Sequence, residues 1–361
     1  FNRSVISWCG ALGGIGVREE WRTRRTGMAV ARMMEDAFPV IFKGSKYEDA
    51  MPIGHLDVIN NFSPDALRDY YNKWYRPDLQ AVVVVGDVDV NVIESQIKRQ
   101  FGGLSLPPNA PQRRYYPVAD NKRMITHVMR DAEQPIALAH LYMKRDVKPT
   151  SVRSSERYQQ EIYEHDLICL MLNERLSKQQ SGAKAPFTAA TVKDGKFLIV
   201  QTKKAFSLSV SCKRDQIEAG LSAAVGLLEQ ARQWGFTTGE LTRAKAILRN
   251  KAERCNNQRG QLANHHYVKQ CLDHYLYGEP ILSTAEELHV RRKFDAELTL
   301  ADVNTAIKEL VTDRNQVLLL YAPKKADFRV PSTEQLERCV RGAQKKSYPA
   351  YQECVRPKML L

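Results

Sequence analysis

Two adjacent glutamates near the start of the chain could help to hold a metal ion. Glu19 and Glu20 are followed closely by Arg22, Arg24 and Arg25. A catalytic zinc site uses three protein ligands and keeps one position open for the attacking water, and a carboxylate on a packed helix is a fixed oxygen donor. Taken alone, the residues favour a plainer interpretation, in which both glutamates are solvated charges that pair with the neighbouring arginines.

The histidines do not supply the remaining ligands in a recognisable order. None begins His-x-x-Glu-His or His-Glu-x-x-His, the patterns that place two imidazoles and a carboxylate on one helix. Residues Glu161–His165 come nearest but start with glutamate, and the adjacent His265 and His266 point in different directions on a helix. The chain alone therefore cannot complete a zinc site. Its eight histidines are His55, His127, His140, His165, His265, His266, His274 and His289.

The cysteines indicate neither a structural zinc site nor a redox motif. There are seven, widely scattered, and no two form Cys-x-x-Cys. An odd number gives weak support to reduced thiols and a cytosol-like compartment, although exported proteins also carry odd numbers. The sequence leaves the compartment open between cytoplasm and periplasm.

The elements that would position such a site include a predicted helix over 64–74. Ser63 can cap its free N–H groups, Pro64 suits its first position and Asp65 suits its positive end. Arg76-Pro77 ends it, because the residue before a proline avoids the helical region. An apolar stripe at helical spacing is expected to pack in a core. The stripe consists of Leu67, Tyr70, Tyr71 and Trp74.

A buried strand and a second helix are predicted next. The β-branched run Ala81–Val85 is typical of a buried strand. Gly86-Asp87 turns the chain, and Asn91 is expected to cap a helix that reaches Phe101.

Read as a pattern, this run resembles the insulinase/pitrilysin family of zinc metallopeptidases, the inverted zincins. The similarity rests on several short motifs in the family's order. Upstream, Val17–Arg25 resembles the family's "VIxEExR" helix. The motifs of the run are Lys46-Tyr47, Met51–Gly54, Tyr70–Asp78, Val82–Asp89 and Phe101–Leu104.

The resemblance implies a role for Glu20 as the third zinc ligand. The other two ligands and the general base would come from an upstream His-x-x-Glu-His, which this chain lacks. Two explanations stay open: a fragment of a longer protease, or a non-catalytic relative. The glycine-rich Cys9–Gly16 stands where the family carries an acidic segment, and the start at Phe1 without methionine favours truncation.

The second region also resembles the family. Leu172–Leu176 with Ala185–Phe187 resembles "LNxRL … PF", and Trp234–Lys245 resembles "GFTxxEL-xxAK". The resemblance implies an α+β fold of two related units, each a mainly antiparallel sheet with helices on one face, as in the LuxS/pitrilysin-like metalloenzymes. The second unit would be a degenerate copy without metal.

Periodicity predicts further elements in this region. The predicted strands cover 126–130, 136–142, 197–202, 207–212 and 316–321, and the predicted helices 154–179, 215–234, 238–253 and 299–310.

Composition shifts suggest four segments. Residues 1–106 would be the C-terminal part of the metal-binding domain, 107–120 a proline-rich linker, 121–328 the second domain, and 329–361 a connector without its own core, leading to a second half.

Composition excludes some classes of protein. With 361 residues and 43% hydrophobic residues, the chain can form two globular cores, and it has no apolar stretch of membrane-spanning length. The net charge of +13 is spread along the chain without interleaved aromatics, which favours a solvated surface over nucleic-acid binding.

Together these expectations describe part of a zinc endopeptidase that hydrolyses peptides or unfolded polypeptides with metal-activated water inside an enclosed chamber. The chain by itself would be inactive and bind no zinc. Its partners would be a peptide substrate and a second half of the protein or a homologous subunit. The alternative is a catalytically inactive homologue that acts as a scaffold or partner subunit.

Overall fold

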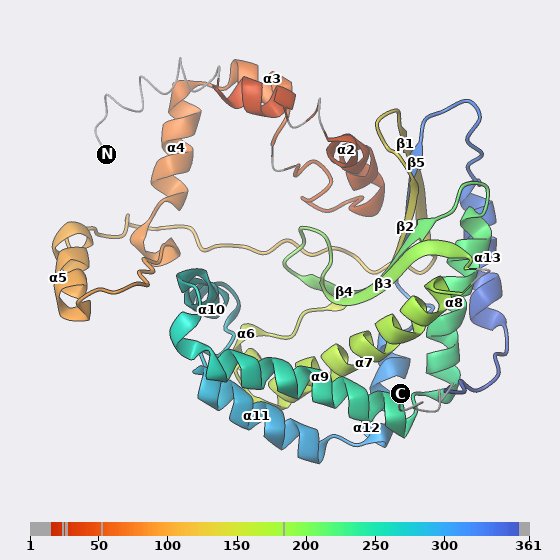
Figure 1. Cartoon of the computed structure of the whole chain (residues 1–361). Helices are drawn as coiled ribbons and strands as arrows, with labels where there is room; N and C mark the ends of the chain where they lie inside the picture. Colours follow the sequence, from red (N-terminus) through yellow and green to blue (C-terminus); the bar gives the residue numbers. More distant parts are fainter. Residues whose placement is uncertain (1–15, 24, 26–27, 52, 183–184, 354–361) are drawn as a thin grey trace.

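The computed structural model describes residues 16–353 except 24, 26–27, 52 and 183–184, and its fold is α+β (Figure 1). Five strands form one sheet in the order β1-β5-β2-β4-β3. Strand β1 runs parallel to β5, and the other neighbouring pairs are antiparallel. The strands are β1 (Ile125–Asp131), β2 (Ala137–Asp146), β3 (Phe187–Lys196), β4 (Lys203–Cys212) and β5 (Gln316–Pro323).

Helices surround this sheet and also form an N-terminal arm that extends away from it (Figure 1). The longer ones are α2 (Ala29–Ile41), α4 (Pro64–Trp74), α5 (Val90–Phe101), α7 (Glu156–Gln180), α8 (Ile217–Trp234), α9 (Thr238–Asn257), α10 (Asn264–Tyr277), α11 (Thr284–Glu297), α12 (Leu300–Leu310) and α13 (Thr333–Lys345). Short helical segments are α3 (Leu56–Asn61), α6 (Thr150–Arg153), η1 (Pro77–Leu79) and η2 (Arg259–Gln261).

The main core lies between the sheet and helices α7 and α8. Alternate residues of β2 and β4 point into it, as the two-residue period of a strand requires. Leu167, Met171 and Leu172 of α7 are fully buried against them. The helix predicted over 154–179 therefore exists and supports the second unit.

A second core covers part of the opposite face of the sheet, where α2 packs on β1 and β5. Phe38 and Phe42 meet Phe197 and the β5 side chains Val317 and Leu319. The sequence analysis identified no helix over 29–41, so this packing was not anticipated.

An ion pair fastens α2 to β1. Arg32 donates two hydrogen bonds of 2.7 Å to the carboxylate of Asp131. These bonds hold the pKa of Asp131 at about 2. Helix α2 is thus anchored to the sheet by charge as well as by apolar contact.

In the N-terminal arm, the predicted helix α4 is confirmed and two other predictions are wrong. Ser63 caps α4, since its hydroxyl accepts from the Ala66 N–H at 3.1 Å. Helix α5 is capped by Asp89 and not by Asn91, because the Asp89 carboxylate accepts from the N–H groups of Asn91 and Val92, at 2.9 and 3.1 Å. Ala81–Val85 is not a strand. No strand in the described ranges lies beside it to complete its backbone hydrogen bonds.

The β3–β4 hairpin corrects a second strand prediction. Residues 197–202 form the turn between the strands, and β3 is the earlier segment Phe187–Lys196. In the turn, Phe197 and Val200 are buried against α2. Their burial explains why this segment has the apolar pattern of a strand.

The predicted connector beyond residue 329 contains one helix within its described part. Helix α13 packs on α8 and buries Leu336, Val340 and Ala343. After it, Trp234 donates to the Tyr348 carbonyl at 2.6 Å, and the Arg175 guanidinium lies 4.1 Å from the centre of the Tyr351 ring. The segment is therefore attached to the second unit as far as residue 353.

Residues 107–120, the predicted linker, contain neither helix nor strand, and their role as a linker stays a prediction. Its end is fixed, because Val118 is buried in the α2 core and the Ala119 carbonyl accepts from Lys144 at 3.1 Å.

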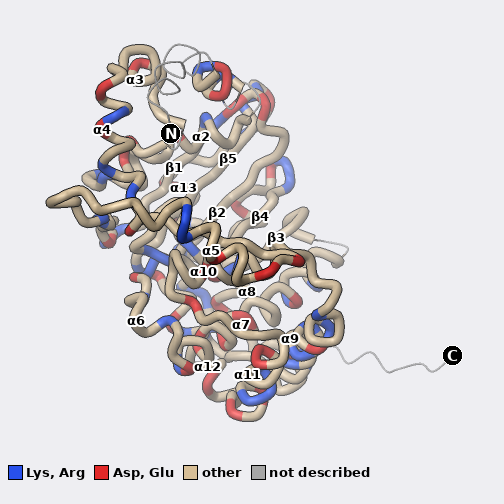
Figure 2. The backbone as a smooth tube through the Cα atoms, turned by 90° about the vertical axis from the view of Figure 1, so that its left-hand side faces the viewer, with Lys and Arg blue, Asp and Glu red and all other residues tan. Residues whose placement is uncertain are grey.

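No helix in the described ranges is long and apolar enough to cross a bilayer. Both basic and acidic residues occur along α7 to α12 (Figure 2).

Candidate functional site

The proposed ligand Glu20 lies on a helical stretch that covers residues 16–23, and its side chain is exposed. The neighbouring Glu19 accepts two hydrogen bonds from Arg22, at 2.9 and 2.7 Å. The plain interpretation, a solvated charge paired with an arginine, therefore describes Glu19. The role of Glu20 stays a prediction.

Trp21 attaches this helical stretch to the Met51–Gly54 motif. Its indole N–H donates to the Gly54 carbonyl at 3.2 Å. Arg25 lies over the Trp21 ring at 4.6 Å and pairs with Glu35 of α2 at 2.7 Å. Two segments that the family resemblance singles out are thus side by side, and both are connected to the helix that packs on the sheet.

The described residues do not by themselves fit a zinc ion. Among them, no group of three or more His, Cys, Asp or Glu side chains is placed to hold a metal. A single exposed carboxylate is too few ligands for zinc, so we derive no catalytic step through a metal from this structure.

The histidines are distributed over separate environments. His127 pairs with Asp36 at 2.9 Å, and His140 lies 2.8 Å from the Ser209 hydroxyl. Burial lowers the pKa of His140 to about 4, so this imidazole is neutral at pH 7. His165 contacts Asp194 at 2.9 Å. Each of these three histidines thus has a local packing or hydrogen-bonding role.

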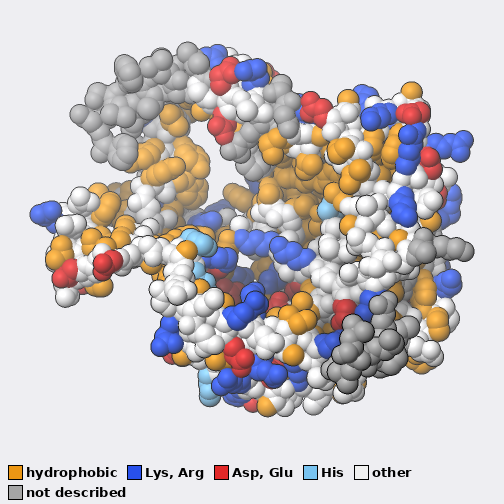
Figure 3. Space-filling model, viewed as in Figure 1, with side chains coloured by type: hydrophobic (Ala, Val, Ile, Leu, Met, Phe, Trp, Pro, Cys, Tyr) orange, Lys and Arg blue, Asp and Glu red, His pale blue; other side chains and the backbone are white. Residues whose placement is uncertain are grey.

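The arm formed by α3, α4 and α5 has no core of its own. None of these three helices contains a buried residue. The expected burial of the 67–74 stripe and of 81–85 is therefore wrong for this chain, because Tyr70 is 58% and Val82 51% exposed. Figure 3 shows hydrophobic side chains gathered on this arm and a hollow between it and the body.

This exposed surface, which we call the arm surface, is extensive for a folded chain. Scattered exposed apolar residues are ordinary, but contiguous patches mark sites of contact with other protein. The large exposed hydrophobic residues of the arm surface are Val58, Phe62, Leu67, Tyr70, Tyr75, Val82, Val84, Val88, Val90, Val92, Phe101, Leu104 and Leu106.

A polar pocket that the sequence analysis did not identify lies beside α7. Its volume is about 730 Å³, and it is bounded by α7, the β3–β4 hairpin, α10 and α11. His165 was noted only as part of an imperfect metal motif. The sequence shows Lys196 and Lys204 on either side of the hairpin turn. Their pairing follows only from the register of β3, and the sequence pattern predicted this strand over 197–202 instead of Phe187–Lys196.

A family model and several relatives agree on the kind of protein. Residues 61–248 match the model described as "Peptidase M16 inactive domain". A "Zinc protease PQQL-like" of Arabidopsis thaliana is 24% identical over 311 residues, which are 86% of this chain and 29% of that protein. A "Probable zinc protease PqqL" of Haemophilus influenzae is 23% identical over 310 residues, 85% of this chain and 32% of that protein. The chain thus spans about a third of their length.

Solved structures share the fold. The first half of the periplasmic protease PqqL from Escherichia coli has a TM-score of 0.82 at 19% identity, covering 98% of this chain and 73% of that one. A mutant of the ferredoxin protease FusC in complex with Arabidopsis ferredoxin has a TM-score of 0.74 at 17% identity, covering 98% of this chain and 38% of that one. From the family model and the motifs together, this chain belongs to the M16 peptidase family, the insulinase/pitrilysin family, and carries that family's inactive domain.

Proposed function

We propose that this chain is part of a zinc-dependent endopeptidase that hydrolyses peptides or unfolded polypeptides with metal-activated water in an enclosed chamber. The observation that carries the proposal is the match of residues 61–248 to the M16 inactive domain. Relatives described as zinc proteases align over most of the chain and support it. In this proposal the chain supplies a wall of the chamber and one metal ligand, and it is inactive alone.

Glu20 is the proposed ligand, and the chain's contribution is to hold it in place. Trp21 and Arg25 connect its helical stretch to Gly54 and to α2. A His-x-x-Glu-His segment, outside the sequence described here, would supply two histidines and the general base. When bound, zinc would polarise the peptide carbonyl and activate the attacking water.

The arm surface is the proposed docking face for the rest of the enzyme. Its occupant is either more of the same polypeptide or a homologous subunit, with a strand pairing against Ala81–Val85. The exposed valines of that segment and the apolar stripe of α4 support this assignment. A substrate peptide would lie extended along a sheet edge, since main-chain hydrogen bonds there accept many sequences.

The proposed compartment is the periplasm. The similarity to the periplasmic protease PqqL of Escherichia coli supports it. Fractionation of cells with detection of the protein in the periplasmic or cytoplasmic extract would decide the matter.

The test compares zinc content and cleavage of an unstructured casein substrate in the protein expressed from its complete gene, with Glu20→Gln and Glu19→Gln variants. Glu19 is a matched control, because it is adjacent and paired with Arg22. We expect stoichiometric zinc and chelator-sensitive cleavage in the parent and in Glu19→Gln, and loss of both in Glu20→Gln.

The other outcomes are equally informative. Zinc and cleavage that survive Glu20→Gln would reject Glu20 as a ligand while keeping the enzyme. A parent protein without zinc and without cleavage would reject the enzyme and favour the alternative, a catalytically inactive homologue that serves as a scaffold or partner subunit.

A further inference from the structure

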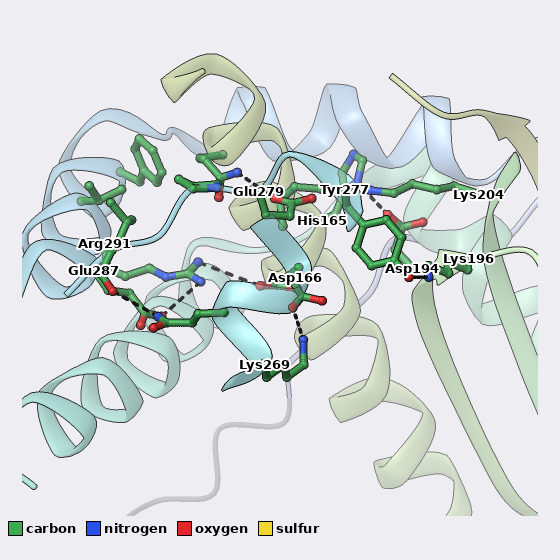
Figure 4. Close-up of a pocket in the computed structure, with 18 residues that line it drawn as sticks. His165, Asp166, Asp194, Lys196, Lys204, Lys269, Tyr277, Glu279, Glu287 and Arg291 are labelled. Atoms are coloured by element: carbon green, nitrogen blue, oxygen red, sulfur yellow. Dashed lines mark hydrogen bonds and ion pairs between the residues drawn. The ribbon is translucent and has the colours of Figure 1, made fainter. Parts of the chain in front are cut away.

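The polar pocket beside α7 contains groups whose hydrogen-bonding capacity is unused. Figure 4 shows His165 and Asp194 close to Lys196, Lys204 and Tyr277, on one side of the pocket. Tyr277 belongs to α10, and the two lysines belong to neighbouring strands. Three elements distant in sequence thus bring charged groups to one place.

The two lysines are held side by side by the sheet. Lys196 of β3 and Lys204 of β4 are direct partners in the register, so their side chains leave the same face of the sheet. Two ammonium groups in this arrangement repel each other unless an anion lies between them. The register therefore creates a local concentration of positive charge.

Neither lysine has a carboxylate partner in the described part of the chain. Lys204 donates to the Tyr158 hydroxyl at 2.8 Å. Lys196 contacts the Tyr277 hydroxyl and lies 3.8 Å from the centre of the same ring. An ammonium has three donors, and a phenol takes one without neutralising the charge. Both lysines consequently keep donors for a ligand.

Asp194 adds a buried acceptor next to these donors. Its side chain is 8% exposed, and its Oδ2 atom is held by Arg145 at 2.5 Å and His165 at 2.9 Å. Its Oδ1 atom is buried without a hydrogen-bond partner. A buried acceptor left unpaired is costly, so a donor brought by a ligand would stabilise Asp194 Oδ1.

The other charged groups of the pocket already have partners. Arg291 lies 3.9 Å from both Asp166 and Glu287. Glu279 accepts from Gln159 at 3.1 Å, and Lys269 pairs with Asp273. These contacts leave the two lysines and Asp194 Oδ1 as the groups that can recognise a ligand.

We propose that this pocket binds a carboxylate of a peptide through Lys196 and Lys204 while an adjoining N–H of the same peptide donates to Asp194 Oδ1. A carboxylate beside an N–H occurs both at a peptide C-terminus and at an acidic side chain, and the pocket matches this shared chemistry. The identity of the ligand as a peptide rests on the proposed peptidase function. The pocket would then select acidic or C-terminal segments of substrates.

The test measures binding of pentaalanine with a free C-terminus, labelled at its N-terminus with an uncharged coumarin, by fluorescence anisotropy. Two further peptides distinguish the sources of the carboxylate. The first is the same peptide with a C-terminal amide, which has no carboxylate, and the second is an amidated peptide with one glutamate, which has only a side-chain carboxylate. The protein is expressed from its complete gene and kept in chelator, so binding is read without cleavage. Absence of binding in this assay would contradict the pocket proposal, whereas absence of zinc-dependent hydrolysis would contradict the proposed function, so the two failures can be told apart.

The decisive variant replaces both lysines, Lys196→Gln with Lys204→Gln. The matched control is Lys193→Gln, an exposed lysine of the same strand that points to the other face of the sheet. We expect the double variant to weaken binding of the carboxylate peptide by about tenfold or more, since each lost charge-assisted hydrogen bond is worth at least that factor. The control should bind as the parent does.

The outcomes separate cleanly. Binding of the free acid but not of either amide identifies a C-terminal site, and binding of the glutamate peptide identifies a side-chain site. Equal affinity for the plain amide, equal affinity in the double variant, or no binding by any of the three peptides overturns the proposal. Ligand protection of Lys196 and Lys204 from acetylation, measured by mass spectrometry, gives the same decision if the double variant does not fold.

Discussion

The most buried charges in the chain are structural. Arg175 of α7 and Glu240 of α9 have fully buried side chains and share two hydrogen bonds, at 2.7 and 2.8 Å. Arg175 also donates to the Gly235 carbonyl at 2.9 Å and lies over the Phe236 ring. One guanidinium thus satisfies the groups where α8 ends and α9 begins.

Replacing Arg175 by methionine should strongly destabilise the protein. The variant leaves the Glu240 carboxylate buried without a counter-charge, so we expect a loss of about 3–5 kcal/mol in the free energy of unfolding, measured with urea. Lys178→Met is the control on the same helix. Its partner is the partly exposed Glu174, and the expected change is below about 1 kcal/mol. Equal losses would contradict a special role for the buried pair.

The Asp194 carboxylate predicts a specific dependence of stability on pH. Burial alone raises its pKa, but the hydrogen bonds from His165 and Arg145 outweigh burial and hold the pKa at about 2. Because the folded pKa lies below the unfolded one, the stabilisation is present above about pH 4. It is lost as pH falls toward 2, and amounts to about 2 kcal/mol.

The measurement compares unfolding of the parent and Asp194→Asn between pH 7 and pH 2. We expect the stability difference to be largest at pH 7 and to shrink between about pH 4 and pH 2, as the parent's carboxyl is protonated first in the unfolded and then in the folded protein. Asp65→Asn, at an exposed pair with Arg68, should show no such narrowing. A difference that stays constant down to pH 2 would show that the ion pairs of Asp194 do not account for its contribution.

At the level of single residues, sequence could indicate Glu20 but not the groups of the pocket. Glu20 was proposed as a ligand through the motif around it, since motifs are local, and this role stays a prediction. Asp194, Lys196 and Lys204 meet His165 only through strand register and helix packing. The spacing of these residues along the chain therefore does not predict that they lie together.

At the level of elements, sequence succeeded where local chemistry decides. Ser63 and Thr237 cap helices as their side chains suggest, and α8 ends at Gly235. It failed where long-range contacts decide. The 197–202 segment is apolar because it is buried under α2, and Ala81–Val85 has the composition of a strand without a neighbour. Pairing partners are a property of the whole fold, and composition cannot supply them.

The end of α8 gives a prediction at this scale. Gly235 has φ of +76° and ψ of −159°, a region that is essentially restricted to glycine, and a Cβ there would overlap the Asn304 side chain. Gly235→Ala should therefore lower the free energy of unfolding by about 1–3 kcal/mol or more. Chemical denaturation of the variant measures this change.

Gly342 is the matched control, since it lies inside α13 and an added Cβ meets nothing within 4 Å. Gly342→Ala should stabilise the protein by about 0.5–1 kcal/mol, because alanine is the better helix former. We therefore expect Gly235→Ala to lower the free energy of unfolding and Gly342→Ala to raise it. Destabilisation by both would mean that helix α13 does not tolerate substitution for reasons other than space.

At the level of the whole molecule, stability is unevenly distributed. The sheet, α7 and α8 share one core, and α2 adds a second on the opposite face. The arm helices α3, α4 and α5 contain no buried residues, and their apolar side chains are exposed to solvent. The arm sequence nevertheless has the amphipathic pattern of packed helices, so we expect its apolar face to be covered by a partner that is not among the described residues.

This imbalance predicts how the isolated chain of residues 1–361 differs from the protein expressed from its complete gene. Segments with few buried contacts open at low free-energy cost and exchange their amide hydrogens quickly. In the isolated chain we expect fast exchange over residues 56–106 and slow exchange in α7, β2 and β5. In the complete protein the arm should become protected by at least about tenfold, because burial of the arm surface against the remaining polypeptide stabilises it. Hydrogen exchange followed by mass spectrometry reads both regions in one sample, with α7 as the internal control. An arm that exchanges equally fast in both proteins would show that its apolar face is not a docking surface, and would remove the main structural support for placing the rest of the peptidase there.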